Sequence, residues 1–164
     1  MSHHERGITL IGGPTASIED GGFAFLTDPT FDAPGEYKLP HVTLKKLARP
    51  ALTAEQTGPI DAALLSHDQH ADNFDQSGKE YAIRAPLVLT TAAGAKGLGG
   101  VAEGLAPGER RESRKPHGSA LTVTATLAPR PGRHRTAVGR CDWIFAHLRR
   151  WHAADLHRAT RSGM

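Results

Sequence analysis

Residues 64–75 read LLSHDQHADNFD, and the fold that we predict for the chain is built around them. The apolar run over residues 60–65 has the length of a buried strand and is too short for a helix. Polar side chains follow this run at once. Because ligands in open α/β sheets bind just outside the carboxyl ends of the strands, the stretch predicts a binding site directly after a buried strand.

The polar part of this stretch contains side chains that can bind metal. His67, His70 and Asp72 place two imidazoles and a carboxylate within six residues. These donors suit zinc or another borderline divalent ion. An alternative is a solvent-exposed turn in which Asp72 or Asn73 caps the helix that follows. The spacing alone leaves both interpretations open.

The residues before this stretch predict short strands and a long surface excursion. Residues 8–11, 15–19 and 23–26 are strand-like segments separated by glycine turns, which indicates an antiparallel meander. Residues 30–58 are rich in proline and glycine, and we expect a surface loop there with one helical turn near residues 44–47. Long connections of this kind are often functional, so the loop is a candidate to overhang the site.

The residues after the stretch alternate between helix and strand patterns. We predict a helix over residues 73–85, a strand over 87–91 and a second helix over 92–98. This order is typical of βαβ units, in which helices are layered on a sheet. The charged run 110–115 is expected at a solvated edge, and residues 121–126 alternate as a strand does. The fold class that these elements predict is α/β.

Two segments of the chain resemble a known family. Residues 67–73 are similar to the HxHxDH metal-binding motif of the metallo-β-lactamase-fold hydrolases, in the branch of the ascorbate-phosphate lactonases, once one inserted residue is allowed. His67 and His70 then match the two histidines and Asp72 the aspartate, while Asn73 stands where the family has another histidine. The Thr-Asp-Pro that contains Asp28 resembles the end of an early strand in the same superfamily. The resemblance spans residues 7–126.

The resemblance implies a fold and a chemistry. The fold is a partial αββα metallo-β-lactamase-like sandwich, and the activity is that of a metal-dependent hydrolase. One or two divalent ions, zinc or manganese, activate water for attack on a small-molecule ester, lactone or phosphodiester.

The resemblance also implies roles for single residues. His67 and His70 are implied as ligands of the first metal, and Asp72 as a ligand of the second metal or as the catalytic general base. Asn73 is implied as a weaker oxygen ligand, and Asp28 as a support that hydrogen-bonds near the metal. The alternative role for Asp28 is to start a turn before Pro29. Catalytic zinc takes three protein ligands, and the third imidazole is hypothesised to come from His134.

The composition changes at residue 127. Residues 127–164 contain eight arginines and two aspartates, a net charge of +6, whereas residues 1–126 carry twelve basic and fifteen acidic side chains. Both tryptophans and the only cysteine, Cys141, also lie in this tail. We therefore predict two parts: residues 1–126 as the N-terminal part of a metallo-β-lactamase-like domain, and residues 127–164 as a basic tail rich in Arg, Pro, His and Trp.

Three interpretations of the tail are open. Its charge and aromatic side chains suit non-specific binding of nucleic acid. Residues 141–158 carry an uneven apolar face, which suits an amphipathic helix. The third interpretation explains more of the composition: a G+C-rich gene is translated out of frame here, and the chain lacks the second half of the fold.

These patterns set the functional expectations. We expect a truncated and impaired hydrolase, and the alternative is a non-enzymatic remnant or a module that binds metal or nucleic acid. An incomplete sandwich exposes a sheet face, which favours self-association. No run approaches the roughly 20 apolar residues of a membrane span, so no membrane partner is expected. The single cysteine and the lack of an apolar signal region predict a cytoplasmic protein.

Overall fold

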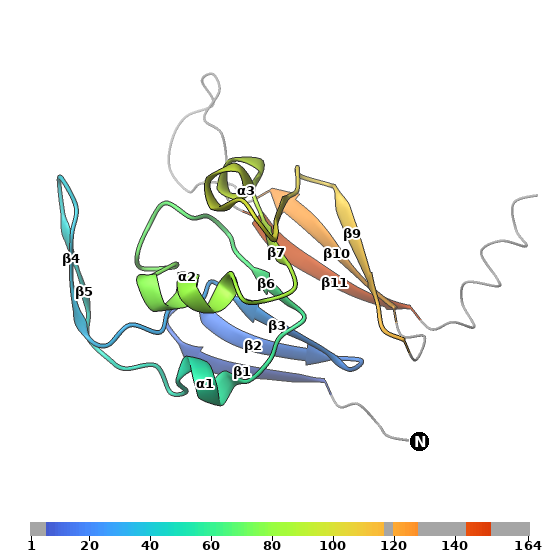
Figure 1. The fold of residues 1–164 in the computed structure, drawn as a ribbon, viewed down its shortest axis with the longest axis horizontal. Coiled ribbons are helices and arrows are strands. Elements are labelled where there is room, and N and C mark those ends of the chain that lie inside the picture. Colours follow the sequence, from blue (N-terminus) through green and yellow to red (C-terminus); the bar gives the residue numbers. More distant parts are fainter. Residues whose placement is uncertain (1–5, 117–119, 128–143, 152–164) are drawn as a thin grey trace, which may run out of the picture.

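A six-stranded mixed sheet forms the centre of the protein. The computed structural model describes residues 6–116, 120–127 and 144–151. The strand order is β1-β2-β3-β6-β7-β8 (Figure 1). These strands are β1 (Gly7–Gly12), β2 (Thr15–Asp20), β3 (Phe23–Thr27), β6 (Ala62–Leu64), β7 (Val88–Thr90) and β8 (Ala102–Gly104).

The first three strands form the predicted antiparallel meander. β1 pairs with β2 and β2 with β3, each in antiparallel register. The two turns contain Gly13, at φ +53°, and the pair Gly21 and Gly22, at φ +62° and +82°. These backbone angles are unfavourable for residues with a side chain, so glycine is what permits the chain to reverse so tightly.

The next strands add to the sheet in parallel and are linked by helices. β3, β6, β7 and β8 pair in parallel in that order. The helices are α2 (Gln76–Ala82) and α3 (Ala92–Leu98), and each begins after a capping side chain. The Asp75 side chain accepts a hydrogen bond from the Gly78 N–H at 2.8 Å, and the Thr91 side chain accepts one from the Gly94 N–H at 2.9 Å. The βαβ succession predicted from the sequence is therefore confirmed. Among the described residues, no helix is both long and apolar enough to cross a bilayer.

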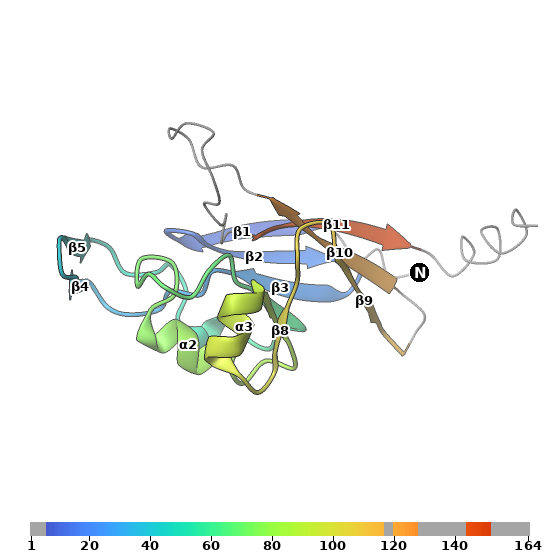
Figure 2. The same cartoon turned by 90° about the horizontal axis from the view of Figure 1, so that it is seen from above.

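A second, three-stranded sheet packs on the opposite face from these helices (Figure 2). Its order is β11-β10-β9, with β9 (Arg110–Arg114), β10 (Ala120–Leu127) and β11 (Ile144–Trp151). The charged residues of β9 thus lie in an edge strand, as expected. The amphipathic helix considered for residues 141–158 is wrong over 144–151, because this segment pairs with β10 along its whole length. Long-range pairing here overrides a helix-like local pattern.

Two apolar cores hold these layers together. One core lies between the main sheet and the helices and contains Ile11, Leu26, Leu65, Phe74 and Val88. The other lies between the two sheets and contains Phe23, Phe25, Leu64, Leu89, Leu121 and Val123. Helices, main sheet and second sheet are three of the four layers of an αββα sandwich, so the predicted α/β fold class is confirmed.

The face between the sheets is uncovered at β1. Ile8 lies beside Ile18, and Ile18 beside Phe25, so these three side chains share one face of the main sheet. Phe25 is fully buried, whereas Ile8 and Leu10 are 76% and 69% exposed. The second sheet therefore covers the middle of the face and leaves its β1 edge open.

We propose that this apolar edge mediates self-association of the chain. We expect the double variant Ile8→Thr, Leu10→Thr to raise the dissociation constant of any dimer at least about tenfold, since burying one such side chain contributes about 1.5 kcal/mol or more. Sedimentation equilibrium measures this constant. The control is Val42→Thr, which alters an exposed apolar residue elsewhere. A parent chain that stays monomeric at every concentration would contradict the proposal.

The excursion before β6 is a hairpin rather than a loop with a helical turn. β4 (Gly35–Lys38) pairs in antiparallel register with β5 (Thr43–Lys46), so the helical turn predicted near residues 44–47 is wrong. The one helix of this region is α1 (Ala54–Thr57), which begins at a capping box formed by Thr53 and Gln56. The hairpin stands out from the body of the molecule beside α2 (Figure 1).

Candidate functional site

The predicted site lies at the carboxyl ends of parallel strands. The loop of residues 65–75, called the motif loop below, leaves the end of β6 and leads into α2. Asp28 follows the end of the neighbouring strand β3, and its N–H donates to the Leu64 carbonyl at 3.1 Å. The topology thus brings the two segments singled out from the sequence to one edge of the sheet.

Hydrogen bonds of the Asp28 and Asn73 side chains hold the motif loop in place. The Asp28 carboxylate accepts a hydrogen bond from the Ser66 N–H at 2.7 Å, and the Asn73 amide nitrogen lies 3.5 Å from the same oxygen. Burial raises the pKa of the Asp28 carboxyl, although the hydrogen bonds from Ser66 and Asn73 act in the opposite direction. The Asn73 amide also donates to the His67 carbonyl at 2.8 Å. Asp28 is the only described non-glycine residue at positive φ, +31°, so the chain accepts backbone strain there.

The structure brings the two predicted histidine ligands side by side. The rings of His67 and His70 lie 5.1 Å apart, centroid to centroid, at an interplanar angle of 78°. His67 is buried with its Nδ1 atom 3.0 Å from the Ser66 hydroxyl, and His70 is exposed. Two imidazoles on one tetrahedral zinc have centroids roughly 5 Å apart, given Zn–N bonds of about 2.0–2.1 Å. The ring separation matches that of two imidazoles on one ion, and it is also the separation of an edge-to-face ring contact.

Asp72 and Asn73 differ in their surroundings. Asp72 is exposed, whereas Asn73 is buried. The Asn73 side-chain oxygen, through which an amide binds metal, has no hydrogen-bond partner among the residues that the structure describes. Neither residue caps α2, because that role belongs to Asp75, so the capping alternative is wrong for both.

The metal-ligand set is incomplete in the described part of the chain. Over residues 6–116, 120–127 and 144–151, no three His, Cys, Asp or Glu side chains are close enough together to hold an ion. His134, hypothesised as the third imidazole, lies outside these residues. The described residues therefore fit a metal in part: they supply two adjacent imidazoles where catalytic zinc takes three protein ligands.

Asp75 is the residue of the motif loop whose role the sequence analysis missed. Its carboxylate is fully buried and accepts from the backbone N–H groups of Phe31, Asp32 and Gly78 at 2.8–2.9 Å. The Lys46 ammonium completes the set at 2.9 Å. This one carboxylate joins the loop after β3, the hairpin and α2. The sequence analysis placed Asp75 inside a helix over residues 73–85, whereas the residue is the N-cap of a helix that begins at Gln76.

Asp32 anchors the hairpin a second time. Its carboxylate accepts from the Ser77 N–H at 3.0 Å and from the Tyr37 hydroxyl at 3.1 Å. Burial alone would raise the pKa of Asp32, but the hydrogen bonds from Ser77 and Tyr37 outweigh it and lower the pKa. The ionised form is therefore the one that the folded protein prefers.

A pH dependence of stability follows from this carboxylate. Because the folded pKa is below the unfolded value of about 3.9, the stabilisation is present above that pH and is lost as the pH falls through the folded pKa. We expect Asp32→Asn to be less stable than the parent at pH 7, with the gap closing toward pH 3. Urea unfolding at both pH values measures the gap. Parallel pH profiles for parent and variant would contradict this, and Glu36→Gln is the control, since its exposed ion pair contributes little.

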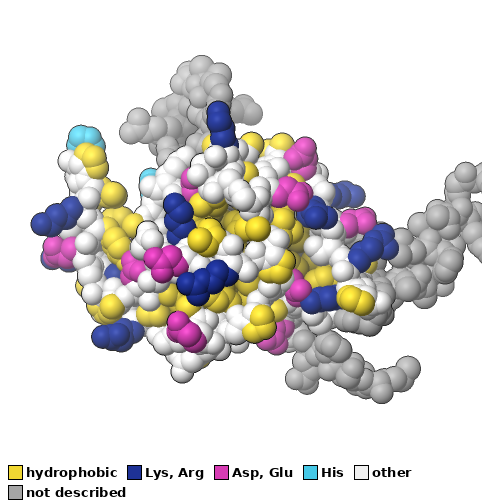
Figure 3. Space-filling view, in the orientation of Figure 1, with side chains coloured by type: hydrophobic (Ala, Val, Ile, Leu, Met, Phe, Trp, Pro, Cys, Tyr) yellow, Lys and Arg dark blue, Asp and Glu magenta, His cyan; other side chains and the backbone are white. Residues whose placement is uncertain are grey.

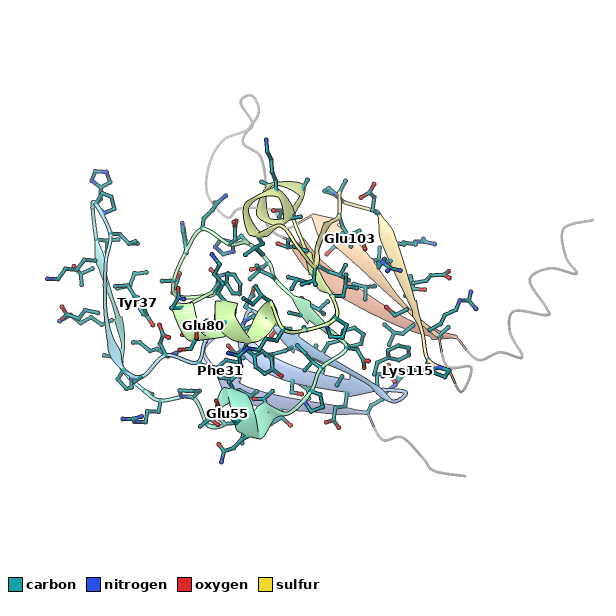
Figure 4. All side chains as sticks on the ribbon, viewed as in Figure 1. Phe31, Tyr37, Glu55, Glu80, Glu103 and Lys115 are labelled. Atoms are coloured by element: carbon teal, nitrogen blue, oxygen red, sulfur yellow. The ribbon has the colours of Figure 1, made fainter. Side chains whose placement is uncertain are left out.

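Two hollows flank the motif loop. One has a volume of about 350 Å³ and lies between the base of the hairpin, the β1–β2 turn and Asp72. The other, also about 350 Å³, lies toward α3 and includes Asp68 and Phe74. Tyr37, on the hairpin, lines both hollows (Figure 4). Neither imidazole lines either hollow, so the hollows border the candidate metal site rather than contain it.

Comparison with known proteins supports the fold. No family model matches the sequence. The structure is similar to isothiocyanate hydrolase from Delia radicum gut bacteria, with a TM-score of 0.59 and 20% identity over 88% of this chain and 58% of that one. It is also similar to a protein from Parabacteroides distasonis assigned as a metal-dependent hydrolase, with a TM-score of 0.51 and 16% identity over 88% of this chain and 56% of that one.

A third similar structure is CmlA, a diiron β-hydroxylase from Streptomyces venezuelae, with a TM-score of 0.53 and 15% identity over 90% of this chain and 28% of CmlA. At these identities the likeness shows the fold alone, and that fold is the predicted metallo-β-lactamase-like one. This chain spans little more than half the length of the two hydrolases, 58% and 56%. The division of the chain at residue 127 stays a prediction.

Proposed function

We propose that the chain belongs to a metal-dependent hydrolase that acts on a small-molecule ester, lactone or phosphodiester, and that its activity is weak. The observation that carries the proposal is the pair of imidazoles, His67 and His70, placed 5.1 Å apart at the carboxyl ends of parallel strands. The similar structures include an isothiocyanate hydrolase and a protein assigned as a metal-dependent hydrolase, which supports hydrolysis as the reaction class.

The residues of the motif loop have separate roles in this proposal. His67 and His70 hold the first ion, zinc or manganese, with the Asn73 side-chain oxygen as a weaker ligand. When bound, a divalent ion would polarise a substrate oxygen and lower the pKa of a bound water. Ser66 sets the orientation of the His67 ring through its contact with Nδ1. Asp28 fixes the backbone from which these side chains project.

Asp72 is the residue that we assign to proton transfer. It is exposed at the border of the hollow beside the hairpin, where a bound substrate can reach it. Its carboxylate accepts a proton from the attacking water and returns it to the leaving group. The alternative role for Asp72 in this proposal is ligand to a second ion.

The test of this function is metal-dependent turnover by the purified 164-residue chain. A panel of esters, lactones, phosphodiesters and an isothiocyanate is assayed with zinc, with manganese and after chelation. The proposal expects slow, chelator-sensitive hydrolysis of at least one substrate class, which Asp72→Asn abolishes or reduces strongly. Turnover that is unchanged by chelation would contradict it.

A second candidate function is binding without catalysis. The observation that favours it is the incomplete ligand set of the described residues, because two imidazoles hold an ion less firmly than the three protein ligands of a catalytic zinc. Saturable metal binding with no turnover on the whole panel would support this candidate. Non-specific binding of nucleic acid by the basic tail is a separate proposal and falls steeply with salt.

A further inference from the structure

The hollow at the base of the hairpin has the properties of a preformed ligand site. Its volume of about 350 Å³ is within the range of small-molecule pockets. The hairpin wall is held by the Lys46 ion pair with buried Asp75 and by the Tyr37 hydrogen bond to Asp32. The chain after the hairpin is held against β1 by a 2.7 Å hydrogen bond from the Ala51 N–H to the Ile11 carbonyl. The wall therefore exists before any ligand binds.

The lining of this hollow is apolar over much of its surface. Pro14 contributes to it from the β1–β2 turn, Leu44 from β5, and Leu47 and Pro50 from the chain after the hairpin. Leu47 is 86% exposed, the highest exposure among the large apolar side chains that the structure describes. Figure 3 shows apolar and basic side chains close together in this part of the molecule. An apolar ligand body would cover surface that is now in water.

Among the described cations around the hollow, one is not already paired with an acidic side chain. Among the described residues that line it, three are basic and one, Asp72, is acidic. Lys46 is committed to Asp75, and Lys45 lies 3.0 Å from Glu36 in an exposed ion pair. Arg49 is exposed and makes no ion pair with the described residues. A guanidinium in this state can bind a carboxylate through two parallel hydrogen bonds.

We propose that this hollow binds a carboxylate on a compact apolar body, with Arg49 pairing with the carboxylate and Leu47 covering the apolar part. This inference rests on the proposed hydrolase function, because it names the class of substrate that the hydrolase acts on. The substrate carries a carboxylate and a small apolar group beside its hydrolysable bond. Asp72, on the motif-loop wall of this hollow, is two residues from His70 in the chain.

The test measures binding without metal or turnover. Hexanoate, hexan-1-ol and hexylammonium are titrated by isothermal calorimetry into the full chain after chelation. Hexanoate should bind about fivefold more tightly than hexan-1-ol, as one solvent-accessible ion pair permits, and hexylammonium more weakly than either. Arg49→Gln should remove the preference for hexanoate and leave hexan-1-ol binding unchanged. Leu47→Ser should weaken hexanoate and hexan-1-ol equally, and both altered residues are exposed, so neither variant disturbs the core.

The matched control is Arg84→Gln, an exposed arginine that lines a different hollow near α1. It should leave all three titrations unchanged. Equal affinity for hexanoate and hexan-1-ol, or the same loss with Arg84→Gln as with Arg49→Gln, would overturn the proposal. Absence of hexanoate binding would overturn it as well. If the chain binds hexanoate selectively but shows no metal-dependent turnover, the subsite proposal is supported and only the hydrolase proposal fails.

Discussion

Replacing Gly78 with alanine should destabilise the protein by about 3 kcal/mol, the upper end of the usual cost of overpacking. Gly78 lies in the first turn of α2, where the helix crosses the chain just after Asp28. A Cβ atom at this position would overlap the Pro29 carbonyl oxygen and lie 2.5 Å from the Pro29 carbonyl carbon. Both are backbone atoms, so a rotamer change cannot relieve the clash. The usual gain from glycine to alanine in a helix, about 1 kcal/mol, is too small to offset it.

The consequence extends beyond α2 itself. If α2 moves away from Pro29, Asp75 loses its hydrogen bonds to the backbone of Phe31 and Asp32, and the motif loop loses its anchor. Urea unfolding followed by circular dichroism measures the change in the free energy of unfolding. The control is Gly35→Ala, whose new Cβ would meet only the Ala33 carbonyl oxygen at 3.7 Å, an ordinary contact. Equal midpoints for Gly78→Ala and Gly35→Ala would contradict the prediction.

The elements that the sequence predicted well are those with a strong local pattern. The buried strand around residues 60–65, the meander and the helix over residues 92–98 each carry their own apolar run, glycine turn or cap. Their formation depends on neighbours in sequence as much as on the rest of the fold. Local patterns were therefore sufficient for the strands of the main sheet from β1 to β7 and for the helices between β6 and β8.

The elements that the sequence missed depend on distant contacts. The hairpin residues show little strand pattern, and Lys46 and Tyr37 fix the hairpin by binding Asp75 and Asp32. β8 consists of three residues, Ala102–Gly104, which become a strand through parallel pairing with β7. β11 is a strand because β10 offers it an edge. Sequence periodicity carries no information about such partners.

The candidate site divides in the same way. The order strand, then polar cluster, was enough to place His67 and His70 at the sheet edge, because topology rules determine where strands end. The four donors around Asp75 could not be predicted from the sequence, because they come from three different segments of the chain. One of them, Phe31, is more than 40 residues from Asp75 in sequence. The pairing of Asp28 with Ser66 was expected only in outline, as support near the metal.

The largest functional effect that we expect is loss of metal binding from the variant His67→Ala, His70→Ala. The comparison uses a background in which His3 and His4 are alanine, so that the N-terminus contributes no adventitious site. The parent should bind zinc or manganese, and the double variant should bind at least about a hundredfold more weakly, because loss of even an outer partner of a ligand costs 10–100-fold. Metal content per chain and chelator competition measure the change.

Two further variants separate ligand loss from unfolding. His70 is exposed, so His70→Ala alone should weaken metal binding while leaving the urea midpoint unchanged. His41→Ala removes an exposed histidine on the hairpin and should change neither quantity. Metal content in the double variant equal to that of the parent would show that the ion, if any, is held elsewhere.

Catalysis should follow the same ligands but at a low level. The described residues supply two imidazoles, an exposed carboxylate and a buried amide oxygen, whereas a catalytic zinc needs three ligands that hold it firmly and one open position. Each lost ligand loosens the ion and raises the pKa of its bound water, so less hydroxide forms at neutral pH. Rapid metal-dependent turnover by a monodisperse preparation, abolished by His67→Ala, would contradict this expectation and would mean that residues outside the described ranges complete the ligand set.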